Sequence, residues 1–257
     1  MLGRFLNRKR KLALGAIAIG LMVWFAVCLP EPLFNTPTST ILEDKDGHLM
    51  AGRIATDGQW RFPMTDSLPE KFVQSIIHFE DEYFYQHPGI NPVSFGRAFK
   101  QNIKAKRVVS GGSTLSMQTI RLARRGKSRS VWEKLIEVVL ALRLELRFSK
   151  DEILNYYAAN APFGGNVVGL DAAAWRYYGR DATQLSWGEM AVLAVLPNQP
   201  SLVYPGKNSD QLLKKRNRLL DKLQHKGIID SFTCELAKEE PLPGSPHRIP
   251  GITPHLI

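Results

Sequence analysis

Hydrophobic residues recur every three or four positions through most of this chain, from about Leu68 onward. This spacing is typical of helices that bury one face. Ser149 and Ser186 are each followed three positions later by Glu, which is the form of a capping box at a helix start. We therefore expect a mainly α-helical domain with helices over 69–86, 92–106, 113–125, 130–147, 150–159, 168–178, 186–195 and 209–226.

A short β segment precedes the helices. Residues 40–42 and 49–54 flank the dipeptide Asp46-Gly47, and Asp57-Gly58 precedes residues 60–62. Asp-Gly pairs favour tight turns because Gly adopts positive φ without steric cost. The pattern predicts a β-hairpin followed by a second turn.

Residues 12–29 contain no charged side chain and follow a basic stretch over residues 1–11. At 1.5 Å per residue such a run just spans a hydrocarbon core of roughly 30 Å. The flanking cations place the N-terminus in the cytoplasm, so we expect one uncleaved transmembrane anchor. A cleaved signal peptide is the alternative, and it fits less well because no small-x-small site ends the run.

These patterns divide the chain into a basic cytoplasmic tail (1–11), an anchor (12–29), a linker with the hairpin (30–62), a helical domain (63–230) and a tail (231–257). Proline fixes φ and removes a backbone donor, so the Pro-rich tail resembles a linker rather than a helix.

The charge distribution indicates an anionic partner. The 257 residues carry a net charge of +10, and between Glu82 and Glu133 there are ten Lys or Arg residues and no Asp or Glu. Such a basic segment suits a phosphate-bearing substrate. The two cysteines lie far apart in the sequence and offer no disulfide framework, and no Cys/His group has zinc spacing.

Glu80 is the first candidate for chemistry. On a continuous helix over 69–86 it falls on the apolar face together with His87, whereas Glu82 points the other way. A carboxylate among apolar residues has a raised pKa and makes a plausible proton acceptor. The alternative is that Glu80 pairs with a buried Arg or caps a helix, and His87 is interpreted as structural or orienting.

Glu137 is the second candidate. It lies in a segment, residues 131–148, that is apolar almost all round and is expected to be a central, buried helix. A carboxylate on such a helix should face something polar. Pairing with a structural Arg is the alternative.

A small-residue turn, residues 110–114, leads into the helix between these two carboxylates. Free backbone N–H groups at a helix start bind phosphate oxygens. Gln118 and Arg121 continue the same face four and seven residues after Thr114, and Arg124 lies just beyond them.

Five segments, taken in order, resemble the motifs of the peptidoglycan glycosyltransferase (family 51) domain of class A penicillin-binding proteins, most like their 1C branch. The resemblance runs from about Thr40 to Leu223. The segments are Glu80-Asp81-x-x-Phe84-x-x-His87-x-Gly89, Gly111-Gly112-Ser113-Thr114-Leu115-x-x-Gln118, Lys134-x-x-Glu137-x-x-x-Ala141-x-x-Leu144-Glu145, Ser149-Lys150-Asp151-Glu152-Ile153-Leu154-x-x-Tyr157 and Lys215-Arg216-x-x-Leu219-Leu220.

The resemblance implies a lysozyme-like fold and an inverting polymerisation of lipid II into glycan strands, with release of undecaprenyl diphosphate. Glu80 resembles the general base, and Glu137 resembles the second acidic residue, which acts directly or through a divalent cation (Mg or Mn) that is not tightly bound. Substrate contacts are expected from His87, Ser113, Thr114, Gln118, Arg121, Arg124, Lys134, Lys215 and Arg216.

The same resemblance implies the setting. The helical domain would lie outside the bacterial inner (cytoplasmic) membrane, with lipid II, the growing glycan strand, the membrane and other cell-wall synthesis proteins as partners, and no nucleic acid. Three positions depart from the family pattern: Arg121 replaces Lys, Glu133 replaces Arg, and Ala159 replaces Asn. We expect no transpeptidase domain, and because no Ser is followed by Lys three residues later we expect no penicillin acylation.

Two other functions stay open at this point. A lytic enzyme on the same fold would cleave finished glycan, although a diphosphate-binding segment would then have no use. A catalytically impaired cell-wall scaffold is the other, suggested by the three departures and the expected lack of a transpeptidase domain. Carboxylates 80 and 137 opening onto separate surfaces would exclude the enzyme.

Overall fold

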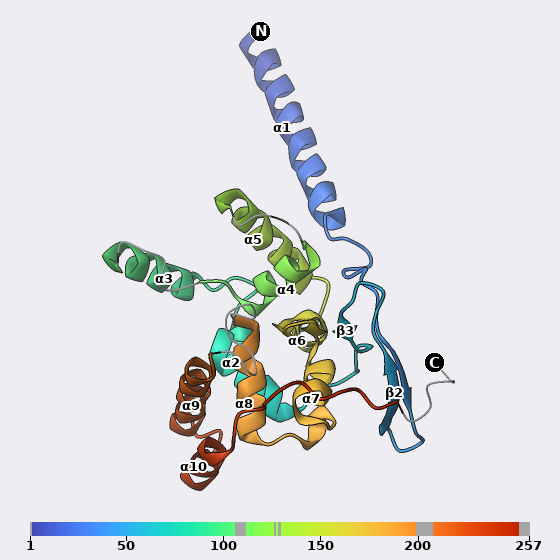
Figure 1. The fold of residues 1–257 in the computed structure, drawn as a ribbon. Coiled ribbons are helices and arrows are strands. Elements are labelled where there is room, and N and C mark those ends of the chain that lie inside the picture. Colours follow the sequence, from blue (N-terminus) through green and yellow to red (C-terminus); the bar gives the residue numbers. More distant parts are fainter. Residues whose placement is uncertain (1, 106–111, 126, 128–129, 199–207, 252–257) are drawn as a thin grey trace.

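The computed structural model describes residues 2–105, 112–125, 127, 130–198 and 208–251. Helices form most of it, with two small sheets beside them and one long helix that projects from the rest (Figure 1). The prediction of a mainly α-helical chain is confirmed. The lysozyme-like detail of the predicted fold stays an expectation.

The helices follow the hydrophobic spacing closely. Every range predicted to be helical contains one, although the range 69–86 is interrupted, and Ser149 and Ser186 both form complete capping boxes. One helix, α10, begins after Asp230 and was not expected, because the Pro-rich composition of the tail hid it. The helices are α1 (Leu2–Val27), α2 (Glu70–Glu80), α3 (Pro92–Ala105), α4 (Leu115–Ala123), α5 (Val131–Glu145), α6 (Lys150–Asn160), α7 (Leu170–Tyr178), α8 (Trp187–Val195), α9 (Ser209–His225) and α10 (Ser231–Glu239), with 3-10 turns at Phe84–Gln86, Ala182–Gln184 and Leu196–Asn198.

The predicted hairpin is confirmed. Strands β1 (Thr40–Glu43) and β2 (Leu49–Arg53) pair antiparallel, and Gly47 in their turn has a φ of +81°. A second sheet has the order β3-β5-β4: β3 (Trp60–Arg61) runs parallel to β5 (Val167–Val168), which pairs antiparallel with β4 (Pro162–Gly164). This sheet ties the segment after the hairpin to the loop that follows α6.

The central buried helix is α8, not the segment 131–148. Residues Met190–Val195 of α8 are all buried, and α8 packs against both α2 and α9. On α5, by contrast, Val131 is 82% exposed and Trp132 72% exposed. Only the stripe Glu137, Leu140, Ala141 and Leu144 is buried, because α5 covers the domain from one side and the described residues leave its other apolar face largely uncovered.

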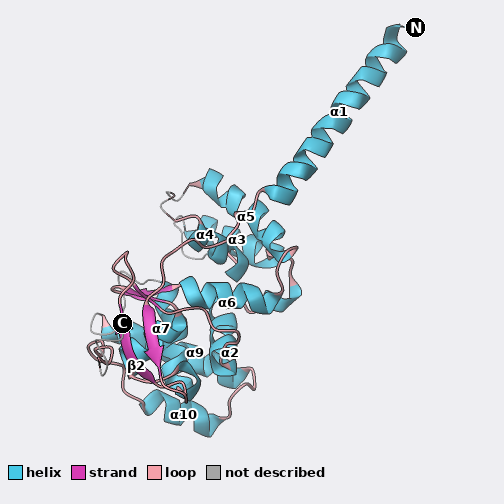
Figure 2. Cartoon of the chain, turned by 90° about the vertical axis from the view of Figure 1, so that its right-hand side faces the viewer, coloured by secondary structure: helices cyan, strands magenta, loops and turns pink. Residues whose placement is uncertain are grey.

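That uncovered face lies at the end of the molecule from which α1 projects (Figures 1 and 2). Arg143 of α5 donates to the carbonyl oxygen of Ala26, at the end of α1, over 2.9 Å from Nη2. Among the residues that the structure describes, no helix combines the length and the apolar character needed to cross a bilayer. The anchor over 12–29 therefore stays a prediction.

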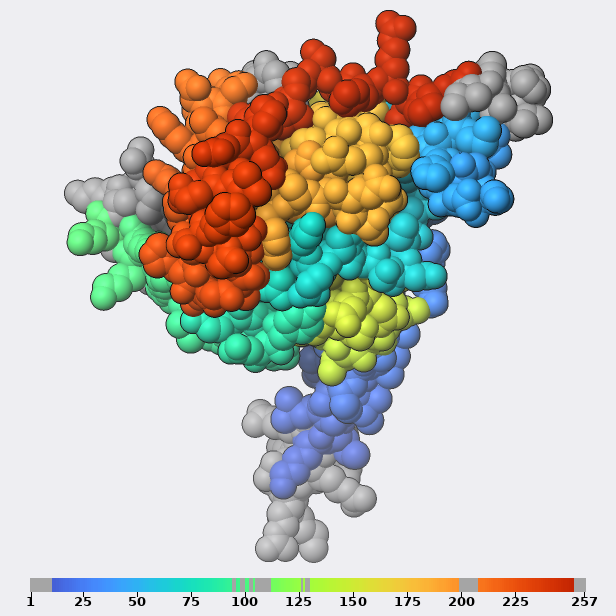
Figure 3. All heavy atoms as spheres, turned by 90° about the horizontal axis from the view of Figure 1, so that it is seen from below, coloured from blue at the N-terminus to red at the C-terminus, as the bar shows by residue number. Residues whose placement is uncertain are grey.

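The tail after α10 packs against the domain. The backbone N–H of His247 donates to the carbonyl of Arg176 in α7, and Gly251 forms an isolated antiparallel bridge with Ala51 of β2. Figure 3 shows this segment crossing the surface of α7 toward the hairpin. The described part of the tail thus follows a fixed path across α7.

Candidate active site

The end of α2 brings the first motif together through a turn. Helix α2 stops at Glu80 because Asp81 leaves helical geometry, with φ −155° and ψ 76°. The prediction of one helix over 69–86 is therefore wrong, and Glu80 and His87 do not share a helical face. Instead, His87 Nε2 lies 3.0 Å from both oxygens of Asp81. The interpretation of His87 as an orienting residue agrees with this contact.

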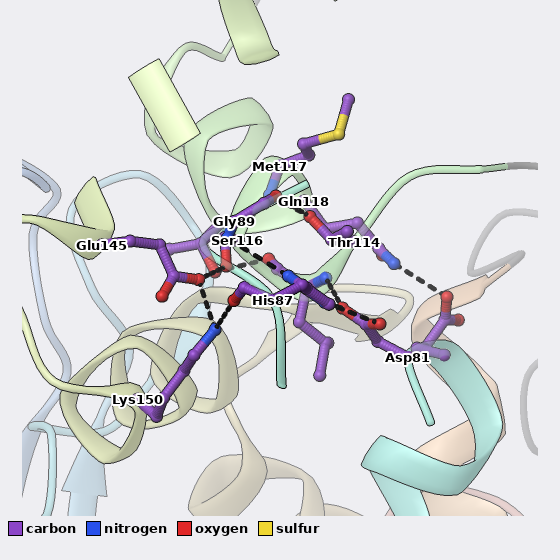
Figure 4. A network of polar contacts seen from close by, with 12 residues as sticks. Asp81, His87, Gly89, Thr114, Ser116, Met117, Gln118, Glu145 and Lys150 are labelled. Atoms are coloured by element: carbon purple, nitrogen blue, oxygen red, sulfur yellow. Dashed lines mark hydrogen bonds and ion pairs between the residues drawn. The ribbon is translucent and has the colours of Figure 1, made fainter. Parts of the chain in front are cut away.

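Asp81 also joins α2 to α4. Its Oδ2 accepts a hydrogen bond of 3.0 Å from the backbone N–H of Leu115, the first residue of α4 (Figure 4). Asp81 and His87 are 6% and 8% exposed, so this contact is nearly dry. A carboxylate at a helix start satisfies a free backbone N–H group, and its negative charge interacts favourably with the positive end of the helix dipole. Asp81 thus fixes the position of α4 relative to Glu80, a role that the sequence pattern had not assigned to it.

Thr114 caps α4, and its hydroxyl group is fully engaged by backbone partners. Its hydroxyl oxygen accepts from the backbone of Met117 at 3.2 Å and its proton goes to the carbonyl of Gly89 at 2.5 Å. Thr114 is 2% exposed, which contradicts a direct substrate contact by its side chain. With the N–H groups of Leu115 and Met117 both taken, the start of α4 offers fewer free donors than the predicted phosphate site required. Residues 110 and 111 of that site lie outside the described residues.

Gly89 is required where it stands. Its φ is +92°, and a Cβ there would lie 2.9 Å from the carbonyl oxygen of Ala141 in α5. Around it, Lys150 donates to the carbonyl of His87 and to Glu145, and Glu145 accepts from the hydroxyl of Ser116 (Figure 4). These contacts join α4, α5 and α6 to the turn that carries His87.

Glu80 is held by two amides. Its Oε2 accepts from Gln118 Nε2 at 2.8 Å, and its Oε1 accepts from Asn198 Nδ2 at 3.3 Å. Asn198 in turn accepts from Lys215 Nζ at 3.0 Å. Burial raises the pKa of Glu80, and the hydrogen bond from Gln118 offsets part of that rise. A carboxylate with a raised pKa that stays accessible to a ligand is suited to general-base chemistry.

Glu137 is 4% exposed and pairs with Arg121. Arg121 Nε and Nη2 each donate to one carboxylate oxygen over 2.7 Å, and Nη2 also lies 3.3 Å from the hydroxyl of Ser113. The hydrogen bonds that Arg121 donates to Glu137 raise the pKa of Arg121. The sequence left open whether Glu137 pairs with a structural Arg, and its partner is the Arg predicted to contact the substrate.

Helix α4 links the carboxylates of Glu80 and Glu137, because one of its faces contacts both. Gln118 and Arg121 are three residues apart and so lie on the same face of α4, where one contacts Glu80 and the other contacts Glu137. The negative charge of Glu80 also contributes to the raised pKa of Arg121. The arrangement that would have excluded an enzyme, two carboxylates on separate surfaces, is not found.

Three other residues predicted to contact the substrate lie beside these carboxylates or reach them through a neighbour. Arg124 pairs with Glu133 at 2.6 Å, so the residue that departs from the family pattern neutralises a cation beside the site. Lys134 lies one turn before Glu137 on α5 and is partly buried. Lys215 reaches the site through Asn198.

Arg216 does not belong to the site, which corrects the sequence prediction. It is 0% exposed, and its guanidinium donates to the carbonyl oxygens of Lys238 at 2.6 Å and Glu240 at 2.5 Å. Neighbouring residues on a helix point about 100° apart, so Lys215 faces Asn198 while Arg216 faces α10. Arg216 fastens the end of α10 to α9.

A metal at Glu137 does not fit this arrangement, since both carboxylate oxygens already accept from Arg121. Within the described ranges, Asp44, Asp46 and His48 are the residues of ligand type that gather closely enough to hold an ion. They lie on the turn of the hairpin, are largely exposed and contact no residue of the site. The structure gives this group no role.

Comparisons with known proteins identify the family of this chain. The family model described as "Transglycosylase" matches residues 47–224. The chain is 36% identical over 251 residues to "Penicillin-binding protein 1C" of Escherichia coli, covering 95% of this chain and 32% of that protein. It is 36% identical over 180 residues to "Penicillin-binding protein 1A" of Pseudomonas aeruginosa, covering 70% and 22%.

The crystal structure of penicillin-binding protein 1A from Haemophilus influenzae aligns with a TM-score of 0.47 and 19% identity, over 84% of this chain and 22% of that one. The chain spans about a third of the length of the 1C relative. It spans less than a quarter of the Pseudomonas relative. The family match covers both carboxylates and the helix between them, and the resemblance to this family is confirmed: the chain belongs to the transglycosylase family.

Proposed function

We propose that this protein is a peptidoglycan glycosyltransferase that polymerises lipid II by inverting transfer and releases a lipid diphosphate. The observation that supports this most directly is the contact of Glu80 and Glu137 with one face of α4, through Gln118 and Arg121. Membership of the transglycosylase family supports the same reaction class.

Glu80 acts as the general base. Its raised pKa keeps it a good proton acceptor near neutral pH, and the amides of Gln118 and Asn198 hold the carboxylate in place. As the acceptor sugar's 4-hydroxyl attacks the donor's anomeric carbon, its proton passes to Glu80. The bond from that carbon to the diphosphate oxygen breaks, and configuration inverts in one displacement.

The leaving diphosphate gains negative charge during this step. Arg121 stands at the donor side, where its guanidinium, charged at any working pH, can stabilise this charge; the contact with Glu137 raises its pKa further. Glu137 thereby acts as a positioning carboxylate for the cation. This gives the second acidic residue a role that needs no proton transfer.

A divalent cation remains part of the proposal only as an ion carried by the diphosphate. The two oxygens of Glu137 are engaged by Arg121, so no step is assigned to a metal held by this chain. The predicted assistance by Mg or Mn is tested by assays in EDTA with either ion added back.

The proposed setting is the outer face of a bacterial cytoplasmic membrane, with residues 12–29 as a single-pass anchor. The apolar face of α5, with Val131, Trp132 and Leu135 all more than half exposed, lies beside α1 and would meet lipid there. This is where the tail of a lipid-linked substrate is held. Other cell-wall synthesis proteins are the proposed partners.

The test is polymerisation of purified lipid II by the full chain in detergent, followed by gel separation of glycan strands, with a class A relative as the positive control. Glycan strands support the proposal, and their absence while the relative is active rejects it. Release of fragments from finished peptidoglycan would favour the lytic alternative. Lipid II binding without turnover, unchanged by Glu80→Gln, would favour the scaffold.

A further inference from the structure

Tyr157 carries a buried hydroxyl that the proposed mechanism has not used. The residue lies in α6 and is 2% exposed. Its phenolic oxygen is buried and has no hydrogen-bond partner within residues 2–105, 112–125, 127, 130–198 and 208–251. An unsatisfied buried hydroxyl destabilises the fold, so native structures seldom keep one without a use.

The surroundings of this hydroxyl are the two groups at the centre of the site. The charges that act on Tyr157 are those of Glu80 and Arg121, which lie on α2 and α4. Helix α6 packs against α4, the helix that carries Gln118 and Arg121, and Tyr157 is buried, so its hydroxyl faces the interior on the side of the site.

The hydroxyl can only serve as a hydrogen-bond donor or acceptor. Burial, and then the charge of Glu80, raises the pKa of Tyr157 well above its ordinary value, so the phenol keeps its proton at any working pH. Tyr157 is therefore neither the base nor a nucleophile. Its nearby charged acceptor is the carboxylate of Glu80.

The present contacts of Glu80 leave room for an exchange. Of its two amide donors, Gln118 is close at 2.8 Å and Asn198 is longer at 3.3 Å. An incoming sugar hydroxyl must reach one carboxylate oxygen and can displace the longer contact. The carboxylate then needs a new donor to keep its orientation.

We infer that Tyr157 is a positioning residue for Glu80, whose hydroxyl donates to the carboxylate when the acceptor sugar is bound. The inference rests on the proposed function. The proton of the sugar passes to Glu80 while the phenolic O–H bond stays intact. Once Glu80 is protonated, the same hydroxyl can rotate and accept from it.

Charged and polar groups from several elements interact with Glu80. They are Asp81 after α2, Gln118 and Arg121 on α4, Asn198 in the 3-10 turn after α8, Lys215 on α9 and Tyr157 on α6. A hydrogen bond from a phenol favours the carboxylate form. Its loss therefore moves the acidic limb of the kcat profile to higher pH.

The experiment compares the full-length wild type with Tyr157→Phe in lipid II polymerisation between pH 4.5 and 9. We expect kcat to fall about tenfold, the acidic limb to rise by about one pH unit, and KM to change little. Thermal unfolding of the free variant should be unchanged or raised, because the change removes an unsatisfied hydroxyl.

Tyr177→Phe is the matched control. The Tyr177 hydroxyl donates to the carbonyls of Phe163 at 3.0 Å and Gly164 at 3.2 Å, away from Glu80, so this variant should lose stability and keep the wild-type pH profile. An active wild type whose kcat and pH profile are matched by Tyr157→Phe overturns this inference alone. A lower melting temperature for free Tyr157→Phe also overturns it, since the hydroxyl would then already have a partner. A wild type that makes no strands overturns the proposed function and this inference together.

Discussion

Arg121 donates two hydrogen bonds of 2.7 Å to the carboxylate of Glu137, one from Nε and one from Nη2. The side chain of Glu137 is 6% exposed and that of Arg121 is 35% exposed, so the carboxylate is dry while the cation still reaches the site. A Lys at this position could not make the two-pronged contact. The departure from the family's usual Lys therefore has a structural meaning in this chain.

Arg121→Ala should destabilise the protein by about 2–3 kcal/mol, because it leaves the carboxylate of Glu137 buried without a partner. Arg121→Lys should lose about half as much, since it keeps the charge but not the fork. Urea unfolding at pH 7 measures both. The double variant Arg121→Met, Glu137→Leu should recover much of the lost stability but remain inactive. A double variant no more stable than Arg121→Ala would show that the Arg121–Glu137 pair does not stabilise this region.

Glu80→Gln should lower kcat by about 10²–10⁴-fold, since the shape is kept and the basicity is lost. The same change should stabilise the free protein at pH 7 by about 1 kcal/mol, because an ionised carboxylate is no longer held in a partly buried place. Lipid II polymerisation and thermal unfolding measure the two effects.

The pH dependence of that gain has a fixed sign. The pKa of Glu80 is raised in the folded state, so the carboxyl favours folding below its unfolded pKa and loses this contribution as pH rises through the folded pKa. The stability difference between variant and wild type should therefore be largest near neutral pH and vanish below about pH 4.5. A constant difference from pH 3 to 8 would contradict the assignment.

Glu82→Gln should weaken the fold without affecting catalysis. Glu82 lies in the turn after α2 and pairs with Lys222 of α9 at 2.7 Å and with Lys226, which follows α9, at 2.5 Å. The hydrogen bonds from these lysines lower the pKa of Glu82 to about 2. Its contribution is thus complete above the unfolded pKa and is lost as pH falls toward 2.

We expect Glu82→Gln to lose about 1 kcal/mol at pH 7 and low salt, and less at high salt because the pairs are partly exposed. Chemical unfolding at pH 7 and pH 3, each at two salt concentrations, measures this. Polymerisation that falls as much as in Glu80→Gln would show that the two carboxylates act on the same reaction.

Arg216→Met should destabilise the protein by about 3 kcal/mol, since it strips the carbonyls of Lys238 and Glu240 of their donor. The folded fraction should keep its KM for lipid II. Arg218→Met on the same helix is the control, because Arg218 is exposed and its loss should change stability by less than about 0.5 kcal/mol. A large rise in KM for Arg216→Met with unchanged stability would restore Arg216 to the substrate site.

Local patterns were read well from the sequence because they depend on neighbouring residues. Helical spacing gave nearly all the helices, Ser149 and Ser186 were recognised as caps, and the Asp-Gly turn located the hairpin. The prediction failed where a single long-range contact decides where a helix ends. Asp81 leaves the helical geometry of α2 and accepts a hydrogen bond from the first residue of α4. Such a contact spans 34 residues and leaves no periodic signal.

The order and chemistry of the motifs, set by the sequence alone, determined the family and the helical class and pointed to Glu80 and Glu137 as the candidate acidic residues. Only the tertiary structure decided that Asn198 contacts Glu80, that the Tyr157 hydroxyl is buried, that Arg121 holds Glu137, that Arg216 is structural and that one face of α5 is largely exposed. The reason is physical: composition and period state which residues can be buried, whereas burial itself and the partner of each charged group depend on which helices pack together.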